Sequence, residues 1–168
     1  AAPIHIDDTP SRTMLQILAT ARRLKLRHGL GLVMIDYIQL IDADDSRDSR
    51  QEQIAKISRR LKMMARELHV PVIALSQLNR GVENREDRRP RMADLRESGA
   101  IEQDADMVLL LHRPDYYDPN DQPGVAEVIV AKNRTGRTDT AKLVFLKNLT
   151  LFDNKANIEA PIDEGRPF

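Results

Sequence analysis

Two short apolar runs, each followed by a polar residue, most constrain how this chain can fold. Residues 31–35 (GLVMI) lead directly to Asp36, and residues 72–75 (VIAL) are followed two positions later by Gln77. Runs that are apolar on both faces are typical of central parallel strands covered by helices. In open α/β sheets ligands bind outside the carboxyl ends of the strands, so we expect Asp36 and Gln77 to face one site.

An amphipathic helix is predicted between the two strands. Ser49, with Glu52 three residues later, forms a capping-box signature, and apolar residues then recur at helical spacing: Ile54, Ile57, Leu61, Met64 and Leu68. An earlier helix is predicted to begin at Thr9, which precedes a proline, and to end at Gly29, after a strand-like piece at residues 3–6. Alternating helices and apolar strands indicate an α/β protein built from βαβ units.

The second half of the chain does not continue the alternation of helices and apolar strands. Residues 79–106 lose the apolar periodicity and predict a long surface loop with short helical turns, followed by a buried strand at 107–111. Residues 125–132 and 140–146 flank a polar, basic segment and predict an antiparallel hairpin. The tail at 154–168 has no clear period and is expected to be irregular.

Composition limits the classes of function. The 168 residues, of which 41% are hydrophobic, suffice for one domain over residues 1–153. Lysine plus arginine and aspartate plus glutamate number 26 each, so any contact with DNA must be local rather than driven by net charge. The sequence has no cysteine for disulfides or thiolate metal sites. No apolar run approaches the ~20 residues that span a bilayer.

The two strand-end residues suit a nucleoside triphosphate with Mg²⁺. Asp36 offers the carboxylate oxygen that Mg²⁺ prefers, and Gln77 could contact a γ-phosphate or an attacking water without adding charge. Each has a simpler alternative, because Asp36 could cap a turn and Gln77 could bond across neighbouring strand ends. The seven glycines nowhere fit G-x-x-x-x-G-K-[ST], the loop that cradles phosphates.

Basic residues near the hairpin tip form a second candidate. Lys132 and Arg134 are two residues apart where the strand enters the turn, so both side chains are expected on one face. A guanidinium stabilises the transferring phosphoryl group well, and such an arginine finger can come from a neighbouring subunit. The alternative is a solvated hairpin tip.

Arginines at positions 80–97 form a third candidate. Acidic residues are interleaved with them, so the alternative is a solvated loop of mixed charge. Within it, Arg96, Glu97 and Gly99 combine a cation, an acid and a flexible glycine with exposed amides, which suits one phosphate better than a broad basic groove. Aromatic residues make up only 4% of the chain, so DNA binding is expected to be backbone-directed.

Taken together, four motifs in this order resemble the bacterial replicative DNA helicases of the DnaB family. The motifs are residues 33–40 (VMIDYIQL), 72–80 (VIALSQLNR), 94–106 (DLRESGAIEQDAD) and 131–136 (AKNRTG). The resemblance spans about residues 4–153. It implies a RecA-like P-loop NTPase core, with a mostly parallel sheet flanked by helices and a C-terminal antiparallel hairpin, of which this sequence lacks the N-terminal part. It also implies a homo-hexameric ring around single-stranded DNA that couples ATP hydrolysis to translocation and unwinding.

The resemblance implies roles for individual residues. Asp36 corresponds to the Walker B carboxylate that holds Mg²⁺ through water, and Gln77 to the γ-phosphate sensor. Lys132 and Arg134 correspond to the basic pair that reaches the ATP of the neighbouring subunit, with Arg134 as the arginine finger.

The resemblance also implies contacts beyond the nucleotide. Arg96, Glu97 and Gly99 correspond to the central-channel loop that holds one DNA phosphate per subunit. Primase and a helicase loader are the implied protein partners, and the bacterial cytoplasm, at the nucleoid, is the implied location, with no membrane contact.

One departure limits what this sequence can do by itself. In the family, the Walker A loop and the catalytic glutamate precede the matching region, so we expect this chain alone neither to bind ATP tightly nor to hydrolyse it. Two alternatives stay open at this point: a RecA-like or RadA-like recombination ATPase, and a non-catalytic DNA-binding or assembly module. Retention of Asp36, Gln77, Lys132 and Arg134 argues against the second alternative, because a scaffold needs none of them.

Overall fold

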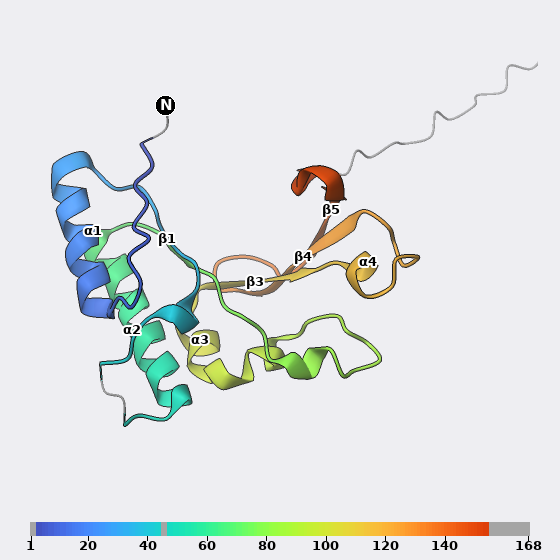
Figure 1. Ribbon diagram of the computed structural model, residues 1–168, viewed down its shortest axis with the longest axis horizontal. Coiled ribbons are helices and arrows are strands. Elements are labelled where there is room, and N and C mark those ends of the chain that lie inside the picture. The colour runs from blue at the N-terminus through green and yellow to red at the C-terminus, as the bar shows by residue number, and fades with distance from the viewer. Residues whose placement is uncertain (1–2, 45–46, 155–168) are drawn as a thin grey trace, which may run out of the picture. The chain divides into compact units, whose positions relative to one another are not determined.

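The computed structural model describes residues 3–44 and 47–154. The chain divides into two compact units, residues 1–108 and 109–168, and each is described by itself. Figure 1 shows helices and strands in both units. Apart from Asn154, the predicted irregular tail at 154–168 lies outside the described residues.

The first helix, α1 (Met14–His28), begins later than the sequence predicts. Thr13 and Gln16 form a reciprocal capping box, in which the Gln16 N–H donates to Thr13 Oγ1 at 3.4 Å and the Thr13 N–H donates to Gln16 Oε1 at 3.0 Å. The predicted start at Thr9 is wrong, because its hydroxyl accepts instead from the Arg12 guanidinium at 3.3 Å. The predicted stop is confirmed, with Gly29 at a φ of 73° that favours glycine.

The N-terminal residues before α1 do not form the predicted strand. The structure shows no regular secondary structure over residues 3–12, and an isolated parallel bridge joins Thr13 to Asp42. Asp7 organises this segment locally, because its carboxylate accepts from the Thr9 N–H at 3.2 Å and from Arg12 at 3.1 Å. Local hydrogen bonds, and not pairing with another strand, therefore order this segment.

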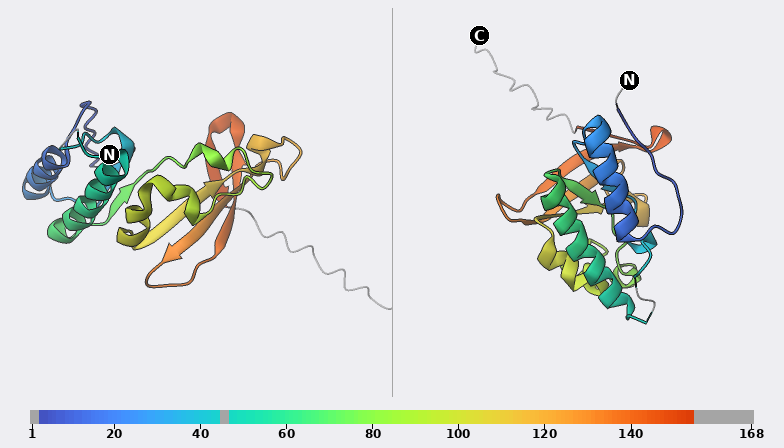
Figure 2. Two further views of the ribbon diagram at one scale, coloured as in Figure 1. Left: turned by 90° about the horizontal axis from the view of Figure 1, so that it is seen from below. Right: turned by 90° about the vertical axis from the view of Figure 1, so that its left-hand side faces the viewer.

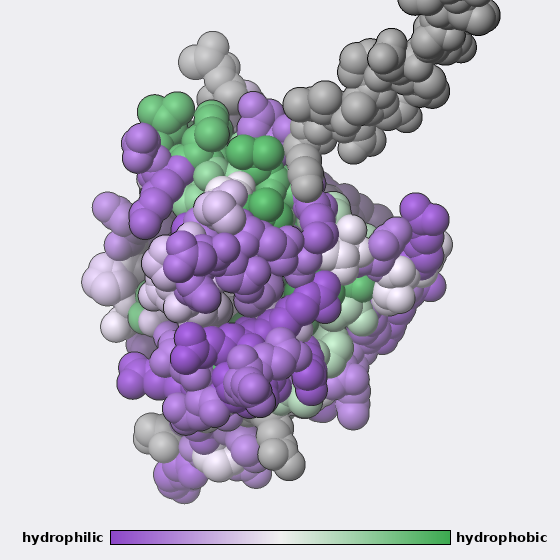
Figure 3. Space-filling model, turned by 90° about the vertical axis from the view of Figure 1, so that its right-hand side faces the viewer, coloured by the Kyte–Doolittle hydropathy of each residue, from purple (hydrophilic) through white to green (hydrophobic). Residues whose placement is uncertain are grey.

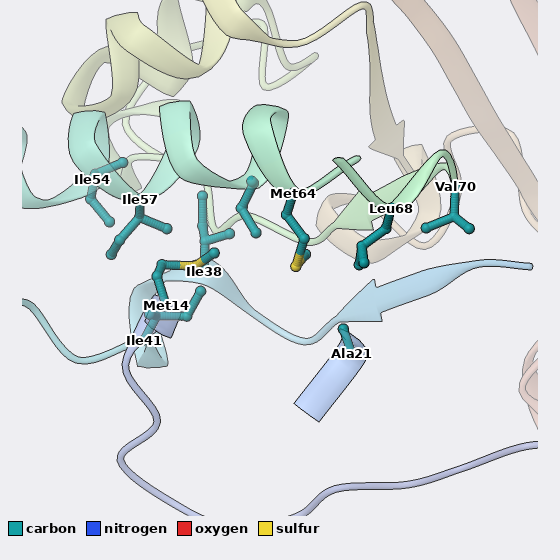
Figure 4. Close-up of a cluster of buried hydrophobic side chains, with 10 residues drawn as sticks. Met14, Ala21, Ile38, Ile41, Ile54, Ile57, Met64, Leu68 and Val70 are labelled. Atoms are coloured by element: carbon teal, nitrogen blue, oxygen red, sulfur yellow. The ribbon is translucent and has the colours of Figure 1, made fainter. Parts of the chain in front are cut away.

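Helix α2 (Arg50–Leu68) supplies most of the core of the first unit. The predicted capping box is confirmed, since the Glu52 N–H donates to Ser49 Oγ and the Ser49 N–H donates to the Glu52 carboxylate at 2.9 Å. The predicted apolar stripe is buried throughout: Ile54, Ile57, Leu61, Met64 and Leu68. Figure 4 shows that the labelled members of this stripe point toward residues of α1 and of the chain after β1.

Two parallel strands pair beside this helix. Strand β1 (Val33–Ile35) pairs with β2 (Val72–Ala74), with Val33 opposite Val72 and Ile35 opposite Ala74. Both are shorter than the apolar runs that predict them. A 3-10 turn, η1 (Ile38–Leu40), follows β1 and buries Ile38 in the core.

An exposed ion pair joins the two long helices on their outer side. The Arg22 guanidinium of α1 donates to the Glu67 carboxylate of α2 at 2.5 and 2.8 Å. Hydrogen bonding by Arg22, more than its charge, lowers the pKa of Glu67. Lys25 also donates to the Leu68 carbonyl, so α1 is held along the C-terminal half of α2.

The predicted loop at 79–106 contains helical turns, as expected. These are η2 (Arg80–Val82), η3 (Met92–Ser98) and α3 (Gly99–Asp104), and the last two pack against α2. Val82 and Leu95 are buried, at 5% and 6% exposed. This segment is therefore part of the packed unit and not a solvated loop throughout.

The second unit is built around an antiparallel meander (Figure 2). The order of strands is β3 (Met107–His112), β4 (Val125–Asn133), β5 (Thr140–Leu146) and β6 (Leu151–Asn154), with α4 (Pro114–Tyr117) between β3 and β4 and the 3-10 turn η4 (Lys147–Leu149) before β6. The predicted β4–β5 hairpin is confirmed, with Ile129 opposite Thr140.

The expectation that β3 is a buried strand holds for one face only, because Val108 and Leu110 are buried while Met107, Leu109 and Leu111 are exposed. Strand β6 ends at Asn154, the first residue of the segment predicted to be irregular. The ring of Phe152 on β6 lies 4.8 Å from that of Phe145 on β5. Pairing with β5 supplies the order that the short segment could not have alone.

Hydrophilic side chains cover most of the face drawn in Figure 3. Within residues 3–44 and 47–154, no helix is long and apolar enough to cross a membrane.

Candidate functional site

Asp36 follows β1 directly, at the end where the parallel strand β2 also stops. The ladder continues one step past the strands, because the Leu75 N–H donates to the Ile35 carbonyl at 2.9 Å and the Ile38 N–H donates to the Leu75 carbonyl at 3.0 Å. Asp36 itself is exposed. In the part of the chain that the structure describes, its carboxylate has no hydrogen-bond or ion-pair partner, so its oxygens are available to a ligand.

Gln77 lies in the extended chain just beyond β2. Its backbone is fixed by the side chain of Gln39, whose Nε2 donates to the Gln77 carbonyl at 3.4 Å and whose Oε1 accepts from the Gln77 N–H at 3.4 Å. The same Nε2 donates to Ser76 Oγ at 3.1 Å. The Gln77 side chain is exposed, so its amide can reach a ligand while its backbone is held.

The structure thus brings Asp36 and Gln77 to one end of a pair of hydrogen-bonded strands. The side-chain amide of Gln39 holds the chain after β2 close to the chain after β1. Sequence reasoning did not predict this contact. Its only signal in the sequence was an amide three residues after Asp36, and that signal is weak because cross-strand pairing depends on register.

Lys132 and Arg134 belong to the second unit. Lys132 is half-buried in β4, and Arg134 is exposed in the turn that begins directly after this strand. The expectation that both side chains share one face assumed that the strand continues through Arg134. Because β4 ends at Asn133, the alternation of a strand no longer determines where Arg134 points.

Asn133 organises the turn that carries Arg134. Its Oδ1 accepts from the Thr135 N–H at 3.2 Å and from the Thr135 hydroxyl at 3.4 Å, and its Nδ2 donates to the Arg137 carbonyl at 3.3 Å. A Cβ at Gly136 would lie 2.6 Å from Asn133 Nδ2, so a side chain here would displace that amide. Sequence reasoning did not single out either residue.

The third candidate, at residues 96–99, is helical and not a loop. Arg96 and Glu97 are in η3, and Gly99 is the first residue of α3 with a helical φ of −50°. The side chains of residues 96–98 lie outside the described part of the structure. A Cβ at Gly99 would meet no atom within 4 Å, and the helical φ shows that no unusual backbone conformation requires a glycine here.

An ion pair that sequence reasoning missed lies just before this segment. Asp94 is only 8% exposed, and both of its oxygens accept from the Arg85 guanidinium at 2.9 Å. The interleaved arginines and acids suggested charges surrounded by water, but the Asp94 carboxylate is buried and paired with Arg85 inside the first unit. Nearby, a hydrogen bond from the Arg89 backbone N–H, followed by one from the Arg91 side chain, lowers the pKa of Asp87.

A magnesium nucleotide fits the strand-end residues in part. Among the described residues, no group of three or more histidine, cysteine or acidic side chains could enclose a metal ion. A single unpaired carboxylate at Asp36 is nevertheless the donor set expected where Mg²⁺ keeps several waters and binds phosphate oxygens.

Comparison with known proteins gives a family match over nearly the whole chain. The model of the DnaB-like helicase C-terminal domain matches residues 1–154. The replicative DNA helicase DnaC of Bacillus subtilis strain 168 is 52% identical over 164 residues, which are 96% of this chain and 36% of that protein. The replicative DNA helicase DnaB of Geobacillus stearothermophilus is 50% identical over 167 residues, covering 98% and 36%. The chain therefore spans about a third of the length of these relatives.

Solved structures agree with the sequence comparison. The solved structure of a related ATPase domain superposes with a TM-score of 0.84 at 48% identity, covering 87% of this chain and 52% of that one. A DnaB-like replicative helicase, studied with its interactions with primase, superposes with a TM-score of 0.87 at 47% identity, covering 91% and 37%. The α/β fold expected from the sequence is confirmed by both neighbours.

Proposed function

This chain belongs to the DnaB-like helicase C-terminal domain family, and we propose that it forms part of a replicative DNA helicase. The helicase couples ATP hydrolysis to translocation on single-stranded DNA and to duplex unwinding at the replication fork. The observation that carries the proposal is the unpaired Asp36 carboxylate beside the held backbone of Gln77, at the common end of β1 and β2. That edge is where open α/β sheets bind ligands. The bacterial cytoplasm, at the nucleoid, is the location that goes with this function.

In this proposal the first unit contributes two side chains to a site for ATP with Mg²⁺ in the helicase. Asp36 holds the ion through water, and the Gln77 amide contacts the γ-phosphate. A bound Mg²⁺ neutralises charge on the phosphate oxygens. Gln39 holds the backbone of Gln77, so the point from which the side chain starts is fixed before the nucleotide arrives.

Lys132 and Arg134 act on the nucleotide of a neighbouring subunit. Arg134 is the arginine finger, which stabilises charge on the transferring phosphoryl group, and Lys132 supports it from β4. Hydrolysis then requires at least two subunits, and a homo-hexameric ring provides six such interfaces. The support is the short turn built around Asn133, because it presents an exposed guanidinium from an ordered backbone.

Arg96, Glu97 and Gly99 hold one phosphate of single-stranded DNA in each subunit. The exposed position of Gly99, with open space where a Cβ would stand, supports this role, because a DNA phosphate can approach a residue without a side chain closely. Primase and a helicase loader are the proposed protein partners. Interaction with primase is a property of one structural neighbour.

Subunit mixing tests the central claim. The experiment uses the natural full-length polypeptide that contains this sequence, hereafter the full-length protein, and measures ATP turnover with single-stranded DNA. Asp36→Asn and Arg134→Ala proteins should each be inactive. Their mixture should regain activity, because about one interface in four joins an intact Asp36 to an intact Arg134 after random exchange.

The control is Arg137→Ala, which removes an exposed arginine from the same turn. It should retain nearly full turnover. Full activity of Arg134→Ala alone would refute the finger, and inactivity of the mixture would refute action between subunits. Unwinding of a forked duplex separates a helicase from a recombination ATPase.

A further inference from the structure

Arg85 and Asp94 close a ten-residue segment of the first unit into a compact loop. Both nitrogens at the end of the guanidinium donate to the Asp94 carboxylate at 2.9 Å, which is the paired geometry that an arginine fork favours. The remaining donors of Arg85 reach the Arg89 carbonyl at 3.0 Å and the Asp87 carbonyl at 3.3 Å. The side chain of Arg85 is 31% exposed and that of Asp94 is 9% exposed, so the pair is largely removed from solvent.

Asp94 is tied to the strand end that carries Gln77. The Asn79 N–H donates to the Asp94 carbonyl at 3.0 Å, and Asn79 is two residues after Gln77. The Asn79 side chain accepts from the Gly81 N–H at 3.0 Å, and this bond fixes the turn that starts at Asn79. A backbone hydrogen bond therefore links the chain beyond β2 to Asp94.

Asp94 is also part of the first turn of η3, the helix that contains Arg96 and Glu97. The Arg91 N–H donates to Asp94 Oδ2 at 2.7 Å and begins this helix. The next residue, Leu95, is buried at 6% exposed, so the start of η3 is anchored by both charge and packing. Arg96 follows Leu95 directly along the chain.

We propose that the Arg85–Asp94 pair positions the DNA-contacting segment at residues 96–99 relative to the nucleotide-sensing end of β2. This inference rests on the proposed function, because it takes Gln77 and residues 96–99 as the nucleotide and DNA contacts. Arg85 is a positioning residue in this role: it binds Asp94 and two carbonyls, and it does not itself contact DNA.

The test measures binding of fluorescent oligothymidylate to the full-length protein by anisotropy, over a range of salt concentrations. Arg85→Gln should weaken binding about tenfold, a ratio equivalent to about 1.4 kcal/mol. The slope of log affinity against log salt should stay as in the unmodified protein, because no phosphate contact is lost. A slope reduced by about 0.7 for each subunit that binds the DNA would show that Arg85 contacts a phosphate directly, and would overturn the proposal.

Two further variants separate geometry from charge. Arg85→Lys keeps the charge but loses the fork, so it should remain nearly as impaired as Arg85→Gln; full recovery by lysine would overturn the proposal. The control is Arg91→Gln, which removes the same charge from an exposed pair with Asp87 and should bind DNA within twofold of the unmodified protein. Equal weakening by this control would also count against the proposal.

A separate variant allows for loss of folding. If Arg85→Gln lowers the helix content, Asp94→Asn, which keeps the side-chain shape, replaces it and should give the same unchanged salt slope. Arg96→Ala separates the proposed DNA contact from the proposed positioning role of Arg85. If it leaves DNA binding unchanged, the proposed DNA contact is wrong; if it weakens binding while Arg85→Gln and Asp94→Asn do not, only the positioning role is refuted.

Discussion

Substitutions in the turn that carries Arg134 test whether ATP turnover depends on an ordered conformation of that turn. Asn133→Ala removes the two bonds from Thr135, at 3.2 and 3.4 Å, and the one to the Arg137 carbonyl, at 3.3 Å. These are long contacts on the surface, so each contributes about 0.5 kcal/mol, the low end for a net hydrogen bond. Their sum is about 1.5 kcal/mol, which lowers the equilibrium constant for ordering the turn about tenfold.

The assay is steady-state ATP hydrolysis by the full-length protein at saturating ATP and single-stranded DNA. Asn133→Ala should lower turnover by more than twofold and by at most about tenfold, the limit set by the change in that equilibrium constant. Gly136→Ala should act in the same direction, because its Cβ would lie 2.6 Å from Asn133 Nδ2 and displace that amide. The melting temperature should change little, since the bond from the Val130 N–H to the Asp139 carbonyl at 2.8 Å still closes the hairpin.

Thr138→Ala is the matched control, because it truncates an exposed polar side chain in the same turn without touching Asn133. It should leave turnover unchanged. The reasoning is refuted if Asn133→Ala and Gly136→Ala both keep turnover within twofold of the unmodified protein while Arg134→Ala is inactive. In that case the guanidinium would reach its target without an ordered turn.

Two further predictions concern stability. Met64→Ala should lower the free energy of unfolding by about 2–5 kcal/mol, because Met64 is 1% exposed, whereas Met63→Ala, at a side chain 63% exposed, should change it by less than about 0.5 kcal/mol; urea denaturation measures both. The hydrogen bond from Arg22 lowers the pKa of Glu67 from its ordinary 4.5, so the stabilisation exists above that pH and is lost as the pH falls through the lower value. Arg22→Gln should therefore lower the melting temperature slightly at neutral pH and not in strong acid.

Local features of the first unit could be predicted from the sequence. The capping box at Ser49 and the stripe from Ile54 to Leu68 depend on residues within one helix, so spacing alone determines them. The start of α1 could not be chosen in the same way, because Thr9 and Thr13 both offer caps. Packing decides between them, since Met14, at 3% exposed, must begin the helix to reach the core.

In the candidate site, too, some features could be predicted from the sequence and others could not. The ends of β1 and β2 were predicted to lie together because parallel strands present their carboxyl ends at one edge, which places Asp36 beside the chain of Gln77. The bridge from Gln39 and the Arg85–Asp94 pair could not be predicted, because both join residues through register or through a folded loop. Charge balance over that loop had suggested solvation, and only the burial of Asp94 shows otherwise.

The two kinds of strand pairing also differ in when they can form. In the β4–β5 hairpin Ile129 lies opposite Thr140, whereas Val33 of β1 must wait for Val72 of β2, on the far side of α2. Closing the longer loop costs about 1 kcal/mol more chain entropy, and isolated hairpins form within about 1–10 μs. During synthesis β1 leaves the ribosome long before its partner, while β5 follows β4 almost at once. Of these two pairings, strand β1, which Asp36 follows, therefore stays unpaired longer, and chaperone capture of nascent chains should favour β1 over β4.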